Sequence, residues 1–220
     1  MVKITIYTSL VLSLLVQAIT GIIEILTLFL KVDPEFSFLK QLMLMEIVVQ
    51  ILEFSFYIYW SYNFAKIKNI TPKRYLDWAF TTPTMLITLI FYLIFLKNDK
   101  QLNFFDLFNK EFYTISIVLL LNWVMLLFGY LGEINVIPVL SGVLLGFIPF
   151  LIYYYIIYKK YTSAEGFYIF LYFFIFWSFY GVVALFPYKM KNICYNILDL
   201  FSKNFFGIFL GYLIIRKSIR

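Results

Sequence analysis

Long apolar stretches separated by short polar linkers restrict the folds open to this chain. Each stretch is long enough for a membrane-spanning helix, which needs roughly 20 apolar residues. We expect seven such helices, over residues 4–31, 37–66, 72–96, 111–131, 134–158, 162–187 and 191–216. The clearly polar linkers are Asp33 to Glu35, Lys97 to Lys110 and Lys159 to Glu165. The sequence therefore predicts an all-α membrane protein, in which residues 1–220 form a single seven-helix transmembrane domain.

Composition supports a membrane location and excludes several functions. With 63% hydrophobic and 14% charged residues, the chain is too apolar for a soluble domain. Cys194 is the only cysteine and histidine is absent, so we expect neither an internal disulfide nor a metal site. The net charge of +6 is small and falls at the expected helix ends, where it suits the anionic headgroups of a lipid bilayer better than nucleic acid.

The distribution of basic residues predicts the orientation in the membrane. An odd number of helices places the two termini on opposite sides. If the amino terminus is outside, the cytoplasmic helix ends carry more lysine and arginine than the outer ends. We therefore expect an amino terminus outside and a carboxy terminus in the cytoplasm.

A lysine in the last apolar stretch is the strongest functional signal. Lys203 lies between Ile193 and Ile215, where a bare ammonium costs a few kcal/mol, so we expect it to carry a cofactor. Asp199 lies one turn earlier on the same helical face. On the third expected helix Arg74, Asp77 and Thr81 share a face that should point into the bundle. Two acids would then balance a charged Lys203 and Arg74, and neutral clusters of this kind are tolerated where single charges are not.

Aromatic residues near these charges could supply flat walls for a cofactor. Trp78 adjoins Asp77, and Trp177 and Tyr180 lie one turn apart on the sixth expected helix. In a chain with 23% aromatic residues, most such side chains serve packing or anchor helices at the membrane interface. The prediction of a cofactor site therefore rests on Lys203, and the aromatic residues are only supporting evidence.

The stretch from Arg74 to Pro83, together with Leu198-Asp199-Leu200-Phe201-Ser202-Lys203, resembles the microbial (type 1) rhodopsin family over all seven helices. The resemblance implies that Lys203 binds all-trans retinal as a Schiff base, with Asp77 and Asp199 as counterions. It also implies that Trp78 and Trp177 enclose the polyene. Arg74 and Thr81 should hold Asp77 ionised. The further retinal-binding residues expected are Thr82, Asn122, Met125, Gly129 and Tyr180.

Several positions depart from the outward proton pumps of that family. Thr88 stands where those pumps have a carboxylate proton donor, so reprotonation from inside would lack a dedicated acid. Lys189 and Lys191 stand where pumps similar to bacteriorhodopsin carry paired glutamates. Gly181 and Ala184 leave the sixth-helix wall of the retinal site looser. An efficient proton pump is therefore disfavoured, and Asp77 argues against a chloride pump.

The second expected helix favours a channel. Glu46, Gln50 and Glu53 form one polar face that resembles the second helix of algal channelrhodopsins, and buried carboxylates in a membrane suggest function. We expect one constriction on the extracellular side of the Schiff base, a central one at Glu46 and a cytoplasmic gate at Glu24. The extracellular constriction would comprise Ser13, Gln50, Glu53 and Asn196. The competing interpretation is polar packing between helices without conduction.

The leading hypothesis is a retinal photoreceptor that acts as a light-gated cation channel for monovalent cations or protons. A weak light-driven outward proton pump and a light sensor coupled to a partner are the alternatives, and no enzymatic activity is expected. The residue usage, short loops and compact size resemble channelrhodopsin-like rhodopsins of large algal viruses. Association into a homo-oligomer stays open.

Overall fold

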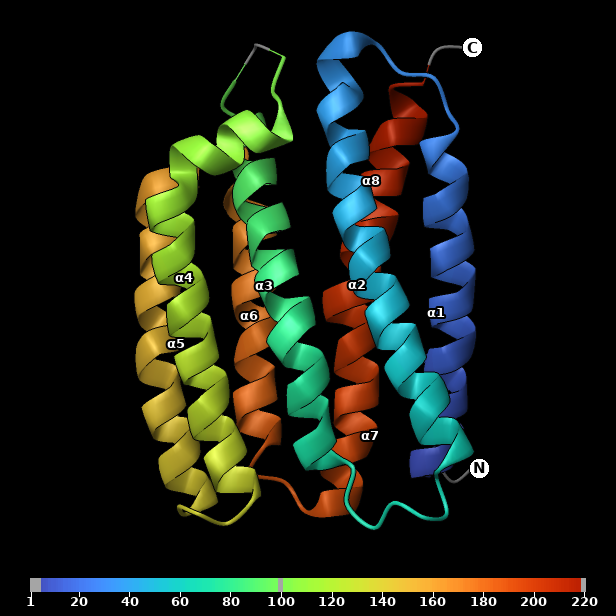
Figure 1. Cartoon of the computed structure of the whole chain (residues 1–220), viewed down its shortest axis with the longest axis vertical. Coiled ribbons are helices and arrows are strands. Elements are labelled where there is room, and N and C mark those ends of the chain that lie inside the picture. The colour runs from blue at the N-terminus through green and yellow to red at the C-terminus, as the bar shows by residue number, and fades with distance from the viewer. Residues whose placement is uncertain (1–4, 99–100, 219–220) are drawn as a thin grey trace.

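The computed structural model describes residues 5–98 and 101–218 and consists mainly of long helices (Figure 1). The helices are α1 (Ile6–Leu28), α2 (Ser37–Tyr62), α3 (Thr71–Phe95), α4 (Phe104–Glu133), α5 (Val139–Tyr161), α6 (Phe167–Val183), α7 (Tyr188–Asp199) and α8 (Phe205–Arg216). A π-helical segment, Leu200–Asn204, joins α7 to α8, so the two form one span. The predicted bundle of seven membrane helices is confirmed, with six long apolar spans and the shorter apolar helix α6.

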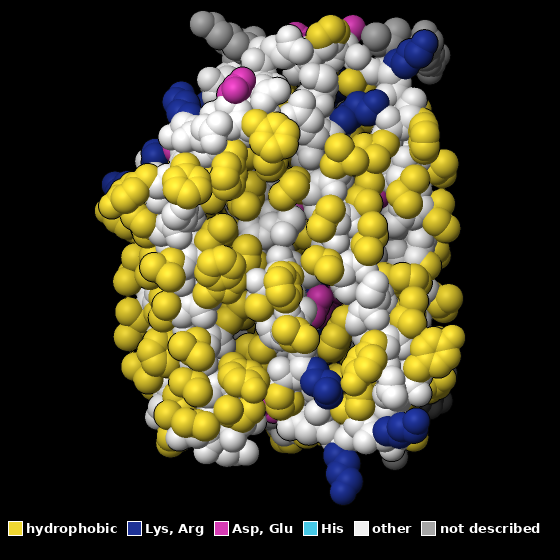
Figure 2. Space-filling view, in the orientation of Figure 1, with side chains coloured by type: hydrophobic (Ala, Val, Ile, Leu, Met, Phe, Trp, Pro, Cys, Tyr) yellow, Lys and Arg dark blue, Asp and Glu magenta, His cyan; other side chains and the backbone are white. Residues whose placement is uncertain are grey.

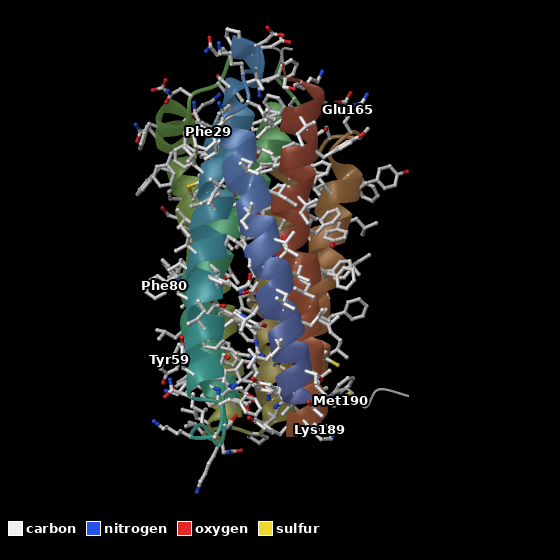
Figure 3. The ribbon with its side chains drawn as sticks, turned by 90° about the vertical axis from the view of Figure 1, so that its right-hand side faces the viewer. Phe29, Tyr59, Phe80, Glu165, Lys189 and Met190 are labelled. Carbon is white, nitrogen blue, oxygen red and sulfur yellow. The ribbon has the colours of Figure 1, made fainter. Side chains whose placement is uncertain are left out.

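The helices pack largely in chain order. Each of α2 to α6 lies against its neighbours in the chain, and α1 closes the bundle by packing against α2, α7 and α8. The two ends of the chain lie at opposite ends of the bundle in Figure 1. Figure 3 labels Phe29 and Glu165 toward one end and Lys189 and Met190 toward the other.

The fourth helix begins seven residues before the predicted start at residue 111. The side chain of Asn103 accepts hydrogen bonds from the backbone N–H groups of Phe105 and Asp106, at 2.9 and 3.3 Å, and so caps the helix. The polar residues of this segment had indicated a linker. They instead form the first turns of α4, which lie over one end of the bundle in Figure 1.

Polar residues face inward and apolar residues face outward along α1. Its exposed side chains include Leu15 and Ile19, which are 58% and 59% exposed. Its buried polar residues are Ser9, Ser13, Gln17, Thr20, Glu24 and Thr27. Figure 2 shows one face of the bundle, with hydrophobic side chains along its length and most lysine and arginine near its ends. A surface of this kind suits hydrocarbon, since lipid tails solvate apolar side chains.

Candidate functional site

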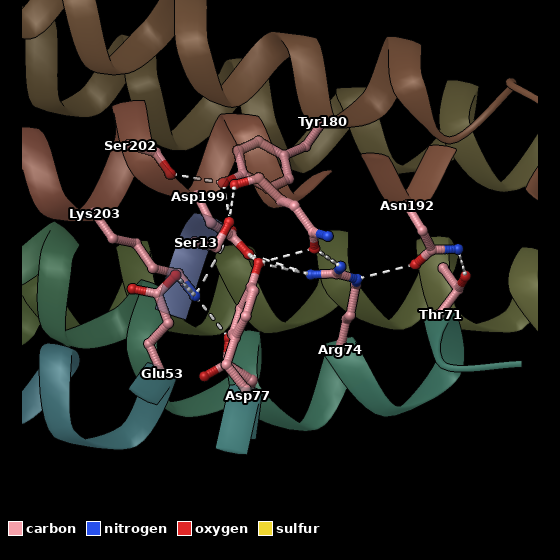
Figure 4. Close-up of polar contacts among 12 residues, drawn as sticks. Ser13, Glu53, Thr71, Arg74, Asp77, Tyr180, Asn192, Asp199, Ser202 and Lys203 are labelled. Carbon is pink, nitrogen blue, oxygen red and sulfur yellow. Dashed lines mark hydrogen bonds and ion pairs between the residues drawn. The ribbon is translucent and has the colours of Figure 1, made fainter. Parts of the chain in front are cut away.

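Lys203 lies in the middle of the bundle among three carboxylates (Figure 4). Its residue is 3% exposed. The ammonium nitrogen donates to Asp77 Oδ2 at 2.6 Å, and it lies 3.7 Å from both Asp199 Oδ1 and Glu53 Oε1. The sequence had placed Asp77 and Asp199 near this lysine, whereas Glu53 was expected farther toward the outside. The structure instead places Glu53 beside the ammonium group.

The segment that carries Lys203 is π-helical. A π-helical turn contains one residue more than an α-helical turn, and such turns in membrane and soluble helices are frequent at functional sites. Asp199 ends α7 directly before this segment and Lys203 lies within it, so the irregular turn sets the orientation of the lysine relative to the acid. The sequence carried no signal for this turn.

Arg74 pairs with Asp199 and not with Asp77. Its guanidinium lies 3.2 Å from Asp199 Oδ2 and donates to Asn192 and Asn196 on α7, with the Trp60 ring 4.8 Å from the guanidinium carbon. Arg74 therefore makes its direct ion pair with Asp199, and the expectation that its charge helps to keep Asp77 ionised stays a prediction. The long arginine side chain reaches across the bundle to α7, although Asp77 lies one turn along its own helix.

Thr81 does not contact the Asp77 carboxylate either. Its hydroxyl donates to the backbone carbonyl of Asp77 at 3.0 Å, a common arrangement for threonine within a helix. The side-chain hydrogen bond that Asp77 accepts comes from Lys203. The predicted inward direction of Arg74, Asp77 and Thr81 is nonetheless confirmed, since all three are buried.

Two tyrosines bind Asp199, and the sequence analysis missed one of them. Tyr57 on α2 donates to Asp199 Oδ2 at 2.6 Å, and Tyr180 on α6 donates to Asp199 Oδ1 at 2.7 Å. The hydroxyl of Tyr180 also lies 2.6 Å from that of Ser202. The spacing of the α2 polar face, extended one turn beyond Glu53, would have indicated Tyr57.

An apolar cavity of about 100 Å³ begins at Lys203 and extends between α3, α4, α5 and α6. Of the expected retinal-binding residues, those that line it are Trp78, Thr82, Met125, Gly129, Trp177, Tyr180 and Lys203. Asn122 lies behind this wall and donates to the Thr82 hydroxyl at 2.8 Å. Lining residues that the sequence did not indicate include Tyr75, Met85, Gly146, Phe147, Tyr195 and Ser202.

Glycines hold space open along the cavity. A Cβ on Gly129 would lie 2.7 Å from the Tyr75 hydroxyl, and a Cβ on Gly181 would lie 2.7 Å from the Phe147 ring. Side chains larger than glycine would therefore displace aromatic rings that shape the walls. The cavity thus has a reactive amine at one end and mainly apolar and aromatic walls along its length.

Buried polar side chains continue away from the cavity, between α1, α2 and α7. On one side of Lys203, Ser13 donates to the Asn196 carbonyl at 3.0 Å, and the Asn196 amide donates to Ser9 at 2.9 Å. On the other side, Asn204 donates to Gln50 at 2.9 Å, and Gln50 donates to the Gln17 carbonyl at 2.9 Å. The predicted grouping of Gln50 with Ser13 and Asn196 was wrong. Along the bundle, Ser13 and Asn196 lie on one side of Lys203, whereas Gln50 and Asn204 lie on the other.

The two remaining acids lie farther along the same side as Gln50. Glu24 packs so closely on Gly207 of α8 that a Cβ there would collide with its carboxylate. Glu46 lies one turn from Gln50 on the same face of α2. Both acids are almost fully buried. The order along the bundle is thus the Asn196 group, then Lys203 with Glu53, then Gln50, and then Glu46 with Glu24.

Comparison with known proteins identifies the family. The family model described as "Bacteriorhodopsin-like protein" matches residues 7–217. The crystal structure of viral rhodopsin OLPVRII is 30% identical, covers 96% of this chain and 98% of that chain, and superposes with a TM-score of 0.86. A comparison with curated protein sequences gave no match. The chain belongs to the microbial rhodopsin family and is similar to a viral rhodopsin.

More distant structures share the fold. A blue light-absorbing proteorhodopsin from Med12 is 19% identical, covers 96% of this chain and 97% of that chain, and has a TM-score of 0.77. Halorhodopsin, a light-driven chloride pump, is 12% identical, covers 96% of this chain and 95% of that chain, and has a TM-score of 0.73. These likenesses show the seven-helix fold and do not distinguish one transport activity from another.

Microbial rhodopsins bind retinal through a Schiff base on a lysine. The site described above fits such a group on its own geometry. Lys203 offers a buried amine at the end of the cavity, and Trp78 and Trp177 present rings from α3 and α6. The acids around the nitrogen would stabilise a positive charge there.

Proposed function

We propose that this protein binds all-trans retinal on Lys203 and works as a light-gated cation channel in a lipid bilayer. The observation that best supports this proposal is the position of Lys203 between two different environments. The apolar cavity lies toward α3 to α6, and the buried polar side chains lie toward α1, α2 and α7. A charge on the Lys203 nitrogen would therefore act on both.

Bound retinal would supply light absorption and a light-driven change of shape at the Lys203 nitrogen. Trp78 and Trp177 would hold its length, while Thr82, Met125, Gly129 and Tyr180 would form the remaining wall, with Asn122 supporting Thr82. Asp77, as the acid nearest to the nitrogen, would be the primary counterion and the proton acceptor. Asp199, positioned by Arg74 and two tyrosines, would be the second counterion.

The proposed ion path follows the buried polar side chains. Ser9, Ser13 and Asn196 would form its extracellular part, Glu53 would lie at the level of Lys203, and Gln50, Glu46 and Glu24 would lead to the cytoplasm. With the positive Lys203 nitrogen beside Glu53, cations are repelled at mid-membrane, where low polarity lengthens the reach of a charge. Transfer of the proton from Lys203 to Asp77 would remove that barrier. Rings of acids and amides favour cations.

The orientation proposed for the chain has the amino terminus outside and the carboxy terminus in the cytoplasm, because the ends that would be cytoplasmic carry more lysine and arginine. Labelling of single cysteines placed in the loops at either end, with a reagent that does not cross membranes, would test this. Labelling from outside of a cysteine in the loop near Glu165 would reverse the assignment.

A weak outward proton pump is the second candidate. The observation in its favour is the 2.6 Å contact between Lys203 and Asp77, which suits direct proton transfer between the two. Voltage clamp separates the candidates: the photocurrent of a channel reverses with the cation gradient, whereas that of a pump stays outward. A photocurrent that never reverses would refute the channel.

Retinal binding is tested separately from transport. Purified protein supplied with all-trans retinal should develop a visible absorption band, and Lys203→Ala should abolish it. Lys189→Ala is a matched control that removes an exposed lysine from the same span and should leave the band intact. A band that persists in Lys203→Ala would show that another residue holds the chromophore.

A further inference from the structure

A second buried ion pair lies at one end of the retinal cavity. Lys191 in the first turns of α7 and Glu133 at the end of α4 approach to 2.8 Å, and their side chains are only 9% and 8% exposed. They lie at the end of the bundle where Figure 3 labels Lys189 and Met190. The proposed ion path and the Lys203 cluster do not use either residue.

Neither charge is where its own helix would favour it. The end of a helix such as α4 carries a partial negative charge, and the beginning of a helix such as α7 carries a partial positive charge. Glu133 and Lys191 therefore each add the disfavoured sign to their own helix. Their burial adds a desolvation cost that only the pairing offsets. Helix stability alone does not explain why these two residues are present.

The pair lies one turn beyond residues that line the cavity. Glu133 follows Gly129 by four residues on α4, and Lys191 precedes Tyr195 by four residues on α7. The cavity residue Tyr75 on α3 lies against Gly129, and Tyr195 on α7 packs against the Trp78 ring of the same cavity. The ion pair therefore covers the end of the cavity at which these two tyrosines lie.

The pair also connects helices that otherwise pack against different partners. α4 packs mainly against α3 and α5, whereas α7 packs against α1 and α6. We propose that Lys191 and Glu133 are positioning residues that hold these two walls together and close this end of the cavity, keeping water away from the Lys203 nitrogen. This inference rests on the proposed binding of retinal at Lys203.

Access to the Lys203 nitrogen can be measured with hydroxylamine, a small water-soluble nucleophile that bleaches a retinal protein by releasing retinal as its oxime. Lys191→Met and Glu133→Gln each break the pair and should bleach several-fold faster in the dark than the wild type. Their visible bands should keep the wild-type position, because neither residue touches the Lys203 nitrogen. The apoproteins should also take up added retinal faster.

The reversed pair, Lys191→Glu with Glu133→Lys, is the decisive variant. It restores the ion pair and places each charge at the helix end that favours it, so its bleaching rate should return to that of the wild type. Accelerated bleaching that the reversal does not slow would overturn the pairing. Single variants that bleach at the wild-type rate would overturn the closure itself.

A second ion pair provides a matched control. Lys160 and Glu111 also approach to 2.8 Å, but they lie at the other end of the bundle, and the Lys160 side chain is 46% exposed. Glu111→Gln should leave the bleaching rate unchanged. Equal acceleration in this control would show that the effect is general destabilisation and would overturn the proposal.

Two further outcomes keep the inference separate from the function. If Lys191→Met does not fold, Glu133→Asp shortens the acidic side chain by one methylene group and so lengthens its contact with Lys191. This variant should show intermediate bleaching, and a wild-type rate there would contradict the closure. If the wild type forms no visible band, retinal binding fails. In that case, labelling of a cysteine placed at the cavity residue Val143, in a Cys194→Ser background, by a water-soluble thiol reagent still tests closure. Protection of that cysteine that Lys191→Met fails to lift would overturn the closure.

Discussion

Removal of the Asp77 charge should move the visible band farther than removal of the Asp199 charge. Asp77 lies 2.6 Å from the Lys203 nitrogen and Asp199 lies 3.7 Å from it. At an effective dielectric constant of about 20, unit charges at these distances interact by about 6 and about 4.5 kcal/mol. Arg74, at 3.2 Å from Asp199, offsets part of the smaller value. Asp77→Asn therefore removes the larger share of the field that holds positive charge at the nitrogen.

The field of these acids stabilises the ground state, in which the positive charge is at the nitrogen, more than the excited state, so its loss should shift the band to the red. Absorption spectra of wild type, Asp77→Asn and Asp199→Asn at one pH give the comparison. Acidification of the wild type should reproduce the Asp77→Asn shift, because protonation removes the same charge. An equal or larger shift in Asp199→Asn, or an unshifted Asp77→Asn band with an unchanged pH titration, would refute the assignment.

Three further predictions concern the polar side of the site. Glu53→Gln should change the reversal potential or amplitude of the photocurrent with the band nearly intact, and unaltered currents in both this variant and Glu46→Gln would refute the proposed path. Gly207→Ala should displace the Glu24 carboxylate, so its photocurrent should match that of Glu24→Ala, and the double variant should add nothing, whereas additive effects would exclude this coupling. Tyr57→Phe removes a charge-assisted hydrogen bond to Asp199 and should lower stability by about 1.5–3 kcal/mol, measured by thermal bleaching, and an unchanged melting temperature would contradict this.

The sequence predicted the fold and the centre of the site because charged residues are rare and costly within the hydrocarbon of a membrane. Lys203, Asp77 and Asp199 could be located without a structure, since buried charges in a membrane need partners. Uncharged polar residues are common in such helices, which is why Tyr57 was missed. The ion pair between Arg74 and Asp199 could not be predicted, because a shared helix face fixes the position of the arginine backbone and not the position of its long side chain.

The helix ends were less predictable for a related reason. Apolar runs mark the parts of helices that lie in the membrane, but helices continue beyond it wherever caps and turns allow. Asn103 extends α4 by capping its first turn, a signal that polar composition alone had concealed. The π-helical turn around Lys203 depends on packing against the neighbouring helices, and local sequence does not report such contacts.

The balance of charge around Lys203 links the two sides of the proposed mechanism. Three carboxyl groups, those of Glu53, Asp77 and Asp199, surround two cations, Lys203 and Arg74. Full ionisation of all three would leave one uncompensated negative charge in hydrocarbon, which is costly. Neither oxygen of Glu53 has a hydrogen-bond partner among the described residues, whereas Asp77 and Asp199 both do. Glu53 is therefore the acid best suited to hold a proton in the dark. Because Glu53 lies 3.7 Å from the Lys203 nitrogen, loss of positive charge from the lysine would act directly on the side of the site where ions are proposed to pass.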